Sequence, residues 1–157
     1  MQKIVPFLWF DNNLEDAIKF YTSVFKDSEI KSITYNTKSA PGPEGAALAA
    51  SFILNGQEFA CLNGGPAFKF NESVSFYVKC DTQDEIDYYW NKLTEDGGTE
   101  SACGWLKDKF GLSWQITPPI LPQYLTDPDR EKADRVMQAM MKMGKIVIKD
   151  IEDAYNG

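Results

Sequence analysis

The pattern of the first half of the chain recurs 69 positions later. The matched apolar pairs are Val5–Val74, Phe7–Phe76, Ala17–Ile86, Phe20–Tyr89, Tyr21–Trp90 and Val24–Leu93. Helical periodicity alone would produce part of this agreement. However, a strand, a helix start and the apolar stripe of the helix all align in one register, which favours an internal duplication of one structural module.

The first copy divides into elements at its turn residues. We predict a strand at Ile4–Phe10 and an amphipathic helix at Asn13–Phe25, opened by Asn12 and Glu15 as a capping-box-like pair. The Asn55-Gly56 pair is a strong hairpin signal. The three remaining predicted strands of this copy are Glu29–Tyr35, Ala47–Leu54 and Glu58–Leu62.

The second copy repeats this order and is followed by an extension. A strand at Ser73–Lys79 precedes a full capping box from Thr82 to Glu85, and Gly97-Gly98 ends the helix. The other predicted elements are strands near Glu100–Leu106 and Leu112–Thr117, a helix at Asp127–Met143, and short segments at Ile146–Ile148 and Asp150–Tyr155. We therefore expect a single α+β domain over residues 1–157, with modules at 1–63 and 73–119 and a C-terminal helical extension at 120–157.

Composition limits the partners and the compartment. The net charge of −7 disfavours nucleic acid, whose phosphates demand a basic surface. The longest apolar run, Ala46–Leu54, is far too short for a membrane helix, and the first residues do not form a secretory signal. The three cysteines lack metal-type spacing and are typical of reduced thiols. We expect a soluble, cytoplasmic protein.

The chain contains no histidine at all. A Ser–His or Cys–His nucleophile pair is therefore excluded, as is the usual general base that titrates near neutrality. Carboxylates, thiols, tyrosines and lysines remain for any chemistry.

Several local runs carry a resemblance to a known family. They are Phe7–Asp11, Ala17–Phe25, the Asn55-Gly56 hairpin, Cys103–Gly111 running into Trp114–Ile116, and Met137–Met140 followed by Lys145-Ile146. With the duplicated module, they resemble the PhnB-like, 3-demethylubiquinone-9 3-methyltransferase-domain branch of the glyoxalase/bleomycin-resistance (vicinal oxygen chelate) superfamily. The resemblance implies two tandem βαβββ modules whose curved sheets face each other around a pocket.

The resemblance also implies positions for metal ligands, on the first and last strands of each module. Here they fall on Pro6, Ser75, Gln115 and either Ala60 or Cys61. Proline and alanine offer no ligand, serine is a poor one, and one neutral amide does not hold a divalent ion. We therefore expect neither a metal site nor another cofactor. The methyltransferase label is not supported, because the turn after the first strand, Asp11–Asn13, lacks the glycines typical of methyl-donor sites.

Alternation along the strands predicts the pocket lining, since neighbouring residues point to opposite faces. The residues expected to face inward are Pro6, Leu8, Cys61, Ser75, Tyr77, Trp105, Ser113 and Gln115. Those expected to face the helices are Phe7, Trp9, Phe76 and Trp114. A cup filled by its own side chains, with no ligand, is the alternative.

Three functions remain open. The first is binding of a small organic molecule in a metal-free pocket between the sheets. The second is an atypical, metal-independent lyase-, isomerase- or transferase-like enzyme acting on a small metabolite, with Cys103 or Gln115 as catalytic candidates and Tyr77 or Ser75 as further acid, base or anchor. The third is an interaction module dimerising through edge strands and the methionine-rich tail helix. Superfamily resemblance implies a homodimer in each case.

Overall fold

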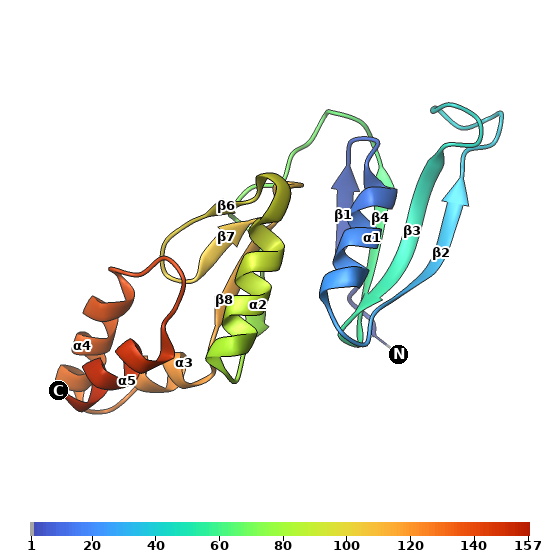
Figure 1. The fold of residues 1–157 in the computed structure, drawn as a ribbon. Helices are drawn as coiled ribbons and strands as arrows, with labels where there is room; N and C mark the ends of the chain where they lie inside the picture. Colours follow the sequence, from blue (N-terminus) through green and yellow to red (C-terminus); the bar gives the residue numbers. More distant parts are fainter. Residues whose placement is uncertain (1) are drawn as a thin grey trace. The chain divides into compact units, whose positions relative to one another are not determined.

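The computed structural model describes residues 2–157. The chain divides into two compact units, one ending at Phe70 and the other comprising Asn71–Gly157 (Figure 1). Within the described residues, no helix is long and apolar enough to cross a membrane.

The first unit is a four-stranded sheet covered on one face by one helix. Its elements are β1 (Phe7–Phe10), α1 (Leu14–Val24), β2 (Glu29–Tyr35), β3 (Ala47–Leu54) and β4 (Gln57–Asn63). The strand order is β1-β4-β3-β2, with β1 parallel to β4 and the other pairs antiparallel. The predicted bounds of β2 and β3 are confirmed, whereas β1 begins at Phe7 instead of Ile4.

The second unit repeats the same topology, with shorter second, third and fourth strands. Its elements are β5 (Ser75–Lys79), α2 (Gln83–Thr94), a 3-10 turn η1 (Glu95–Gly97), β6 (Thr99–Glu100), β7 (Trp105–Lys107) and β8 (Ser113–Thr117). The strand order β5-β8-β7-β6 is that of the first sheet, strand for strand. The predicted α+β fold of two βαβββ modules is confirmed.

One predicted strand is wrong. The run expected as a single strand at Glu100–Leu106 is split into β6 and β7 by four residues. Within that break Cys103 and Gly104 have φ of 58° and 83°, in the left-handed region and outside the extended region of regular strands. The interruption matters because the broken segment forms part of a cavity wall.

The two helices begin by different means. At α2 the predicted Thr82 cap is confirmed, since the Glu85 N–H donates to Thr82 Oγ1 at 3.2 Å. The reciprocal bond of a full capping box is displaced by one residue, because the Glu85 carboxylate accepts from the Asp81 N–H, at 2.8 Å, and not from that of Thr82. At α1 the predicted pair of Asn12 and Glu15 is wrong, because the N-cap is Asn13 and it makes no side-chain cap. The Leu14 N–H instead donates to Asn63 Oδ1 at 3.1 Å, from the end of β4.

Each helix buries one stripe against its own sheet. In the first unit α1 packs on β3 and β4 and buries Ile18 and Tyr21 completely. In the second, α2 packs on β7 and β8 and buries Ile86, Trp90 and Leu93. Burial of side chains this large supplies roughly 1.5–3 kcal/mol each, so each unit has its own core.

The C-terminal extension contains three helices, α3 (Ile120–Leu125), α4 (Arg130–Met140) and α5 (Ile148–Asn156). The helix predicted at Asp127–Met143 corresponds to the shorter α4, whose N-cap Asp129 accepts from the Glu131 and Lys132 N–H groups. The short α3 was not predicted. Helix α4 packs on both α3 and α5.

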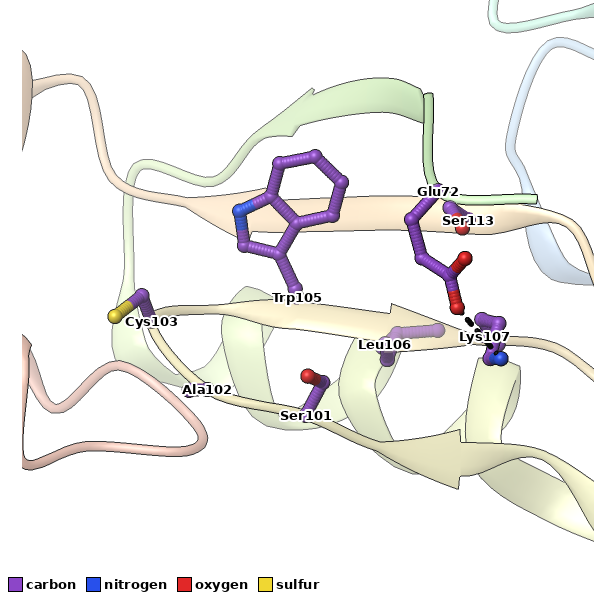
Figure 2. A pocket seen from close by; sticks show the side chains of 8 residues that line it. All are labelled: Glu72, Ser101, Ala102, Cys103, Trp105, Leu106, Lys107 and Ser113. Atoms are coloured by element: carbon purple, nitrogen blue, oxygen red, sulfur yellow. Dashed lines mark ion pairs between the residues drawn. The ribbon is translucent and has the colours of Figure 1, made fainter. Parts of the chain in front are cut away.

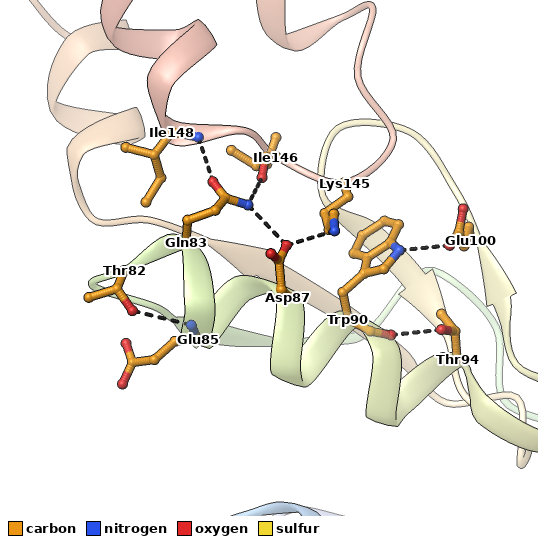
Figure 3. A network of polar contacts seen from close by, with 10 residues as sticks. All are labelled: Thr82, Gln83, Glu85, Asp87, Trp90, Thr94, Glu100, Lys145, Ile146 and Ile148. Atoms are coloured by element: carbon orange, nitrogen blue, oxygen red, sulfur yellow. Dashed lines mark hydrogen bonds and ion pairs between the residues drawn. The ribbon is translucent and has the colours of Figure 1, made fainter.

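The segment between α4 and α5 docks on α2 through a polar network (Figure 3). The Gln83 side chain donates to the Ile146 carbonyl at 3.1 Å and accepts from the Ile148 N–H at 2.9 Å. Lys145 pairs with Asp87 at 2.6 Å, and this contact holds the pKa of the Asp87 carboxyl below its ordinary value. Within the second unit, the tail is thus joined to α2 by specific bonds as well as by packing.

Candidate functional site

The second unit has a cavity of about 400 Å³ beside β7 and β8 (Figure 2). Its lining is Glu72, Ser101, Ala102, Cys103, Trp105, Leu106, Lys107 and Ser113. A volume of this size falls in the range of sites that take small organic ligands.

Strand alternation explains why an aromatic ring, a cation and a hydroxyl meet there. Trp105 and Lys107 are two residues apart on β7 and therefore share a face. Ser113 on β8 lies directly opposite Lys107, which places their Cβ atoms about 5 Å apart. Trp114 and Ile116 point to the other face and are buried on the α2 side. We call the uncovered side the open face of this sheet.

Glu72 completes the charged part of the lining. It lies just before β5, and its carboxylate pairs with Lys107 Nζ at 2.7 Å. The hydrogen bond from Lys107 holds the pKa of the Glu72 carboxyl below its ordinary value. The Glu72 carboxylate is therefore charged near neutral pH, and its 60% exposed side chain remains largely solvated.

Ser113 is the unusual member of the lining. Its residue is only 1% exposed, and within residues 2–157 its hydroxyl has no hydrogen-bond partner. A buried hydroxyl without a partner costs about 1–3 kcal/mol, so it needs a specific reason. Because Ser113 lines the cavity, a ligand atom can supply the missing bond.

A buried carboxylate positions this end of the site. Asp108 is 3% exposed and its Oδ1 accepts from the Phe110 and Leu112 N–H groups at 2.9 and 3.1 Å. Its Oδ2 accepts from Trp114 Nε1 at 2.9 Å. These bonds set the β7–β8 turn, and through it the placement of the strand residues on either side. Sequence reasoning missed Asp108, although an aspartate three residues before Gly111 between two strands is a usable turn signal.

The tail holds the opposite wall. The Cys103 N–H donates to the Met143 carbonyl and the Gly104 N–H to the Gly144 carbonyl, both at 2.8 Å. The Cys103 sulfur lies 3.9 Å from the thioether sulfur of Met141. The left-handed Cys103–Gly104 backbone is therefore kept in place by residues outside the duplicated module.

The predicted lining residues of the second unit lie on one face, as expected. Ser75, Tyr77, Trp105, Ser113 and Gln115 share the open face by register. Trp105 and Ser113 line the cavity. Ser75 and Gln115 lie outside that lining and bond to each other, Gln115 Nε2 donating to Ser75 Oγ at 2.9 Å. The charged residues Glu72 and Lys107 were not predicted.

In the first unit the predicted orientation is wrong. Leu8 is 6% exposed and Cys61 is fully buried, paired with each other on the face that α1 covers. Burial raises the pKa of the Cys61 thiol to about 12. Phe7, expected in the core, is 60% exposed. Pro6 precedes β1, and its carbonyl accepts from the Ala60 N–H at 2.9 Å.

The orientation of β1 was predicted wrongly because the offset between the two copies differs by one residue between their first strands and their helices. The parallel pairs that face the helices are Leu8–Cys61, which is fully or nearly fully buried, and Phe76–Trp114, in which Trp114 is buried and Phe76 half-buried, so the first strands align at a shift of 68. The buried helix residues Tyr21 and Trp90 align at 69. Because side chains alternate along a strand, a shift of one residue exchanges the two faces of β1.

The positions at which the fold family holds a divalent metal do not fit one here. Ser75 and Gln115 satisfy each other, while Cys61 faces the opposite side of its sheet. Elsewhere in the described residues, no three His, Cys, Asp or Glu side chains form a group that could hold a metal ion. The site is therefore best understood through its ring, hydroxyl and charged groups.

The chain is similar to a family of known fold. The family model described as 3-demethylubiquinone-9 3-methyltransferase matches residues 2–117. The solved PhnB protein from Bacillus cereus is 43% identical with a TM-score of 0.69, covering 74% of this chain and 99% of that one. No protein of curated function matches the chain.

More distant structures share the fold alone. A protein from Pseudomonas aeruginosa is 20% identical with a TM-score of 0.58, covering 73% of this chain and 95% of that one. The fosfomycin resistance protein FosX from Mesorhizobium loti is 14% identical with a TM-score of 0.57, covering 81% of this chain and 99% of that one. The family match ends at residue 117, so α3, α4 and α5 lie beyond it.

Proposed function

The chain belongs to the 3-demethylubiquinone-9 3-methyltransferase family, the PhnB-like branch of the vicinal-oxygen-chelate superfamily, and on that premise we propose that it binds a small, planar organic molecule. The observation that carries this proposal is the cavity of about 400 Å³ on the second sheet, with the Trp105 ring at one part and hydrogen-bonding groups at another. Apolar pockets with a few placed polar groups are the usual form of small-ligand sites.

The activity in the family's name is not part of the proposal. A methyl donor usually sits over a glycine-rich turn that follows the first strand. Here β1 and α1 are joined by Asp11, Asn12 and Asn13, and the Leu14 N–H at the helix start is already bonded to Asn63. Neither the turn nor the helix start favours a bound methyl donor.

A ligand screen tests the proposal. A compound at a hundred times its Kd stabilises a protein by about 2.7 kcal/mol, which raises the Tm of a chain this size by roughly 5–10 °C. We expect aromatic fragments to raise the Tm of the wild-type protein. The same fragments should lose most of that effect with Trp105→Ala. Stabilisation of both proteins to the same extent would place the binding elsewhere and contradict the proposal.

A catalytic use of the same cavity is the second candidate. The observation that favours it is Cys103, whose side chain belongs to the lining and is not fully buried. A thiol in a ligand cavity is a candidate nucleophile. Conversion of a bound fragment by the wild-type protein, abolished in Cys103→Ser with binding retained, would establish this role. Conversion retained in Cys103→Ser would exclude it.

We also propose that the protein is a homodimer. Large apolar side chains lie exposed on or next to the first strands of both sheets, namely Phe7 (60%), Val74 (63%) and Tyr77 (44%). Exposed apolar surface of this kind marks interaction sites. Native mass spectrometry or light scattering should give twice the chain mass of 17.7 kDa, and a monomer at micromolar concentration would contradict the proposal.

A further inference from the structure

Resting on the proposed binding site, we infer that the ligand carries a negative charge, received by Lys107 and Ser113, and that Glu72 occupies the place of this charge in the free protein. The charge would lie at one end of a planar body that packs on Trp105. The lining has fixed members, Lys107 and Ser113, and a displaceable one, Glu72.

Lys107 and Ser113 are fixed parts of the sheet. Both lie on paired strands, directly opposite each other, at the two ends of the turn that Asp108 holds. A cation and a buried hydroxyl side by side can both donate to one anionic group. Ser113 is the member whose bonding is unsatisfied within the described residues.

Glu72 is the displaceable part. It belongs to the segment before β5 and reaches Lys107 from outside the β7–β8 pair, with its side chain 60% exposed (Figure 2). An exposed ion pair contributes little to stability, so a ligand carboxylate or phosphate can replace it at small cost. The lining offers no fixed carboxylate to bind a ligand cation, because Glu72, the displaceable residue, is the one acidic residue of the described lining.

Trp105 lies where the rest of such a ligand would extend. It is two residues from Lys107 on the same face of β7, a separation of roughly 7 Å. A benzene ring bearing a carboxylate has these proportions. Figure 2 shows the Trp105 ring and the Glu72 side chain on the same side of the β7 and β8 strands.

Three probes with one ring separate charge from shape. Benzoate carries a negative charge, benzamide none and benzamidine a positive charge. Each is titrated into the full-length protein, with affinity measured by Trp fluorescence or ligand-observed NMR. We expect benzoate to bind at least about tenfold more tightly than benzamide, since hydrogen bonds to a charged group are the stronger ones.

Single substitutions assign the effect to residues. Lys107→Met should weaken benzoate about tenfold or more and leave benzamide within twofold. Ser113→Ala should weaken benzoate about three- to tenfold. Glu72→Gln removes the internal competitor and should tighten benzoate, by up to about fivefold. Lys79→Met is the matched control. It removes the same charge from the open face of the same sheet, but from β5 and outside the lining, and should leave the affinity for benzoate unchanged.

The outcomes distinguish this inference from the proposed function. If all three probes bind equally well through Trp105, the cavity binds planar molecules but the anion receptor is wrong. Tighter binding of benzamidine, or weaker binding of benzoate to Glu72→Gln, would also overturn the inference. If none of the probes binds at millimolar concentration, both the inference and the proposed site fail. Circular dichroism of each variant ensures that a loss of affinity is not a loss of fold.

Discussion

The two units share one topology and differ in what they build on it. In the first, β2 and β3 have seven and eight residues, and β3 is joined to β4 by the regular Asn55-Gly56 turn. In the second, β6 and β7 have only two and three residues, and the chain between them is broken by the left-handed Cys103–Gly104. The cavity lies beside that break.

The two copies therefore share their framework, whereas the site is present in only one of them. The helix stripes and strand order remain equivalent, because each unit needs a core. The open faces do not, since Trp105, Lys107 and Ser113 in the second unit have no counterpart of the same chemistry in the first. The tail adds to this asymmetry by bonding to the broken strand of the second unit.

The largest expected effect tests whether the helices are equivalent. Trp90→Ala should reduce the free energy of unfolding by about 3–5 kcal/mol, because it removes a buried ring and the bond from Trp90 Nε1 to Glu100 at 2.8 Å. Tyr21→Ala, at the matching buried position, should cost a similar amount. Urea denaturation measures both costs, and Tyr88→Ala, at a 41% exposed position, is the control, expected to change the free energy of unfolding by no more than about 0.5 kcal/mol. A cost below about 1 kcal/mol for Trp90→Ala would show that α2 is not a core element.

The next effect contrasts the two turns. Asp108→Asn keeps the bonds to the backbone but turns an amide N–H toward Trp114 Nε1, and should cost about 1–3 kcal/mol. Gly56→Ala, in the first unit, forces a side chain into φ of +76° and should cost about 1–2 kcal/mol. Chemical denaturation checks both. A neutral Asp108→Asn would mean that the carboxylate does not organise the β7–β8 turn.

A smaller effect tests the attachment of the tail. Gln83→Ala removes the two bonds to Ile146 and Ile148, and should lower the hydrogen-exchange protection of the Ile148 amide about tenfold. The Leu14 amide, bonded to Asn63 in the first unit, is the internal reference and should be unchanged. Equal loss at Leu14 would indicate global unfolding, and no loss at Ile148 would show that packing alone holds the tail.

The smallest perturbation compares the thiols without any substitution. Burial raises the pKa of both Cys61 and Cys80 to about 12, so iodoacetamide at pH 8 should label Cys103 and spare the other two. The raised pKa also predicts an alkaline limit of stability: the contribution of the two protonated thiols is complete below the ordinary thiol pKa of 9.0 and is lost as the pH rises from there toward about 12. Mass spectrometry of the labelled peptides measures which thiols have reacted. Urea unfolding at pH 8 and at pH 10 measures the loss of stability. Rapid labelling of Cys61 would contradict its burial.

The features predicted correctly from the sequence are those that depend on interactions between residues close together in the chain. The Asn55-Gly56 turn, the Thr82 cap and the helix stripes depend on neighbouring residues and were predicted correctly. The start of α1 was predicted wrongly, because the hydrogen bond that caps it runs from the Leu14 N–H to the Asn63 side chain, 49 residues away. Only the register of β1 against β4 shows that Leu8 faces the helix.

The candidate site was predicted in part for the same reason. Trp105 and Ser113 followed from strand alternation in the copy whose register was correct. Glu72 and Lys107 meet across 35 positions of sequence, and no local pattern links them. The break at Cys103 and Gly104 depends on backbone bonds to Met143 and Gly144, which a strand pattern does not contain.

The most direct test of the account compares Trp9 and Trp105, one on each sheet, in a single spectrum. The chain has four tryptophans, and 5-fluorotryptophan labelling with single Trp→Phe variants assigns their fluorine signals. On titration with benzoate, the account predicts that the Trp105 signal moves and saturates, while the Trp9 signal stays in place. A saturating shift at Trp9 with none at Trp105 would contradict the claim that the binding site belongs to the second unit.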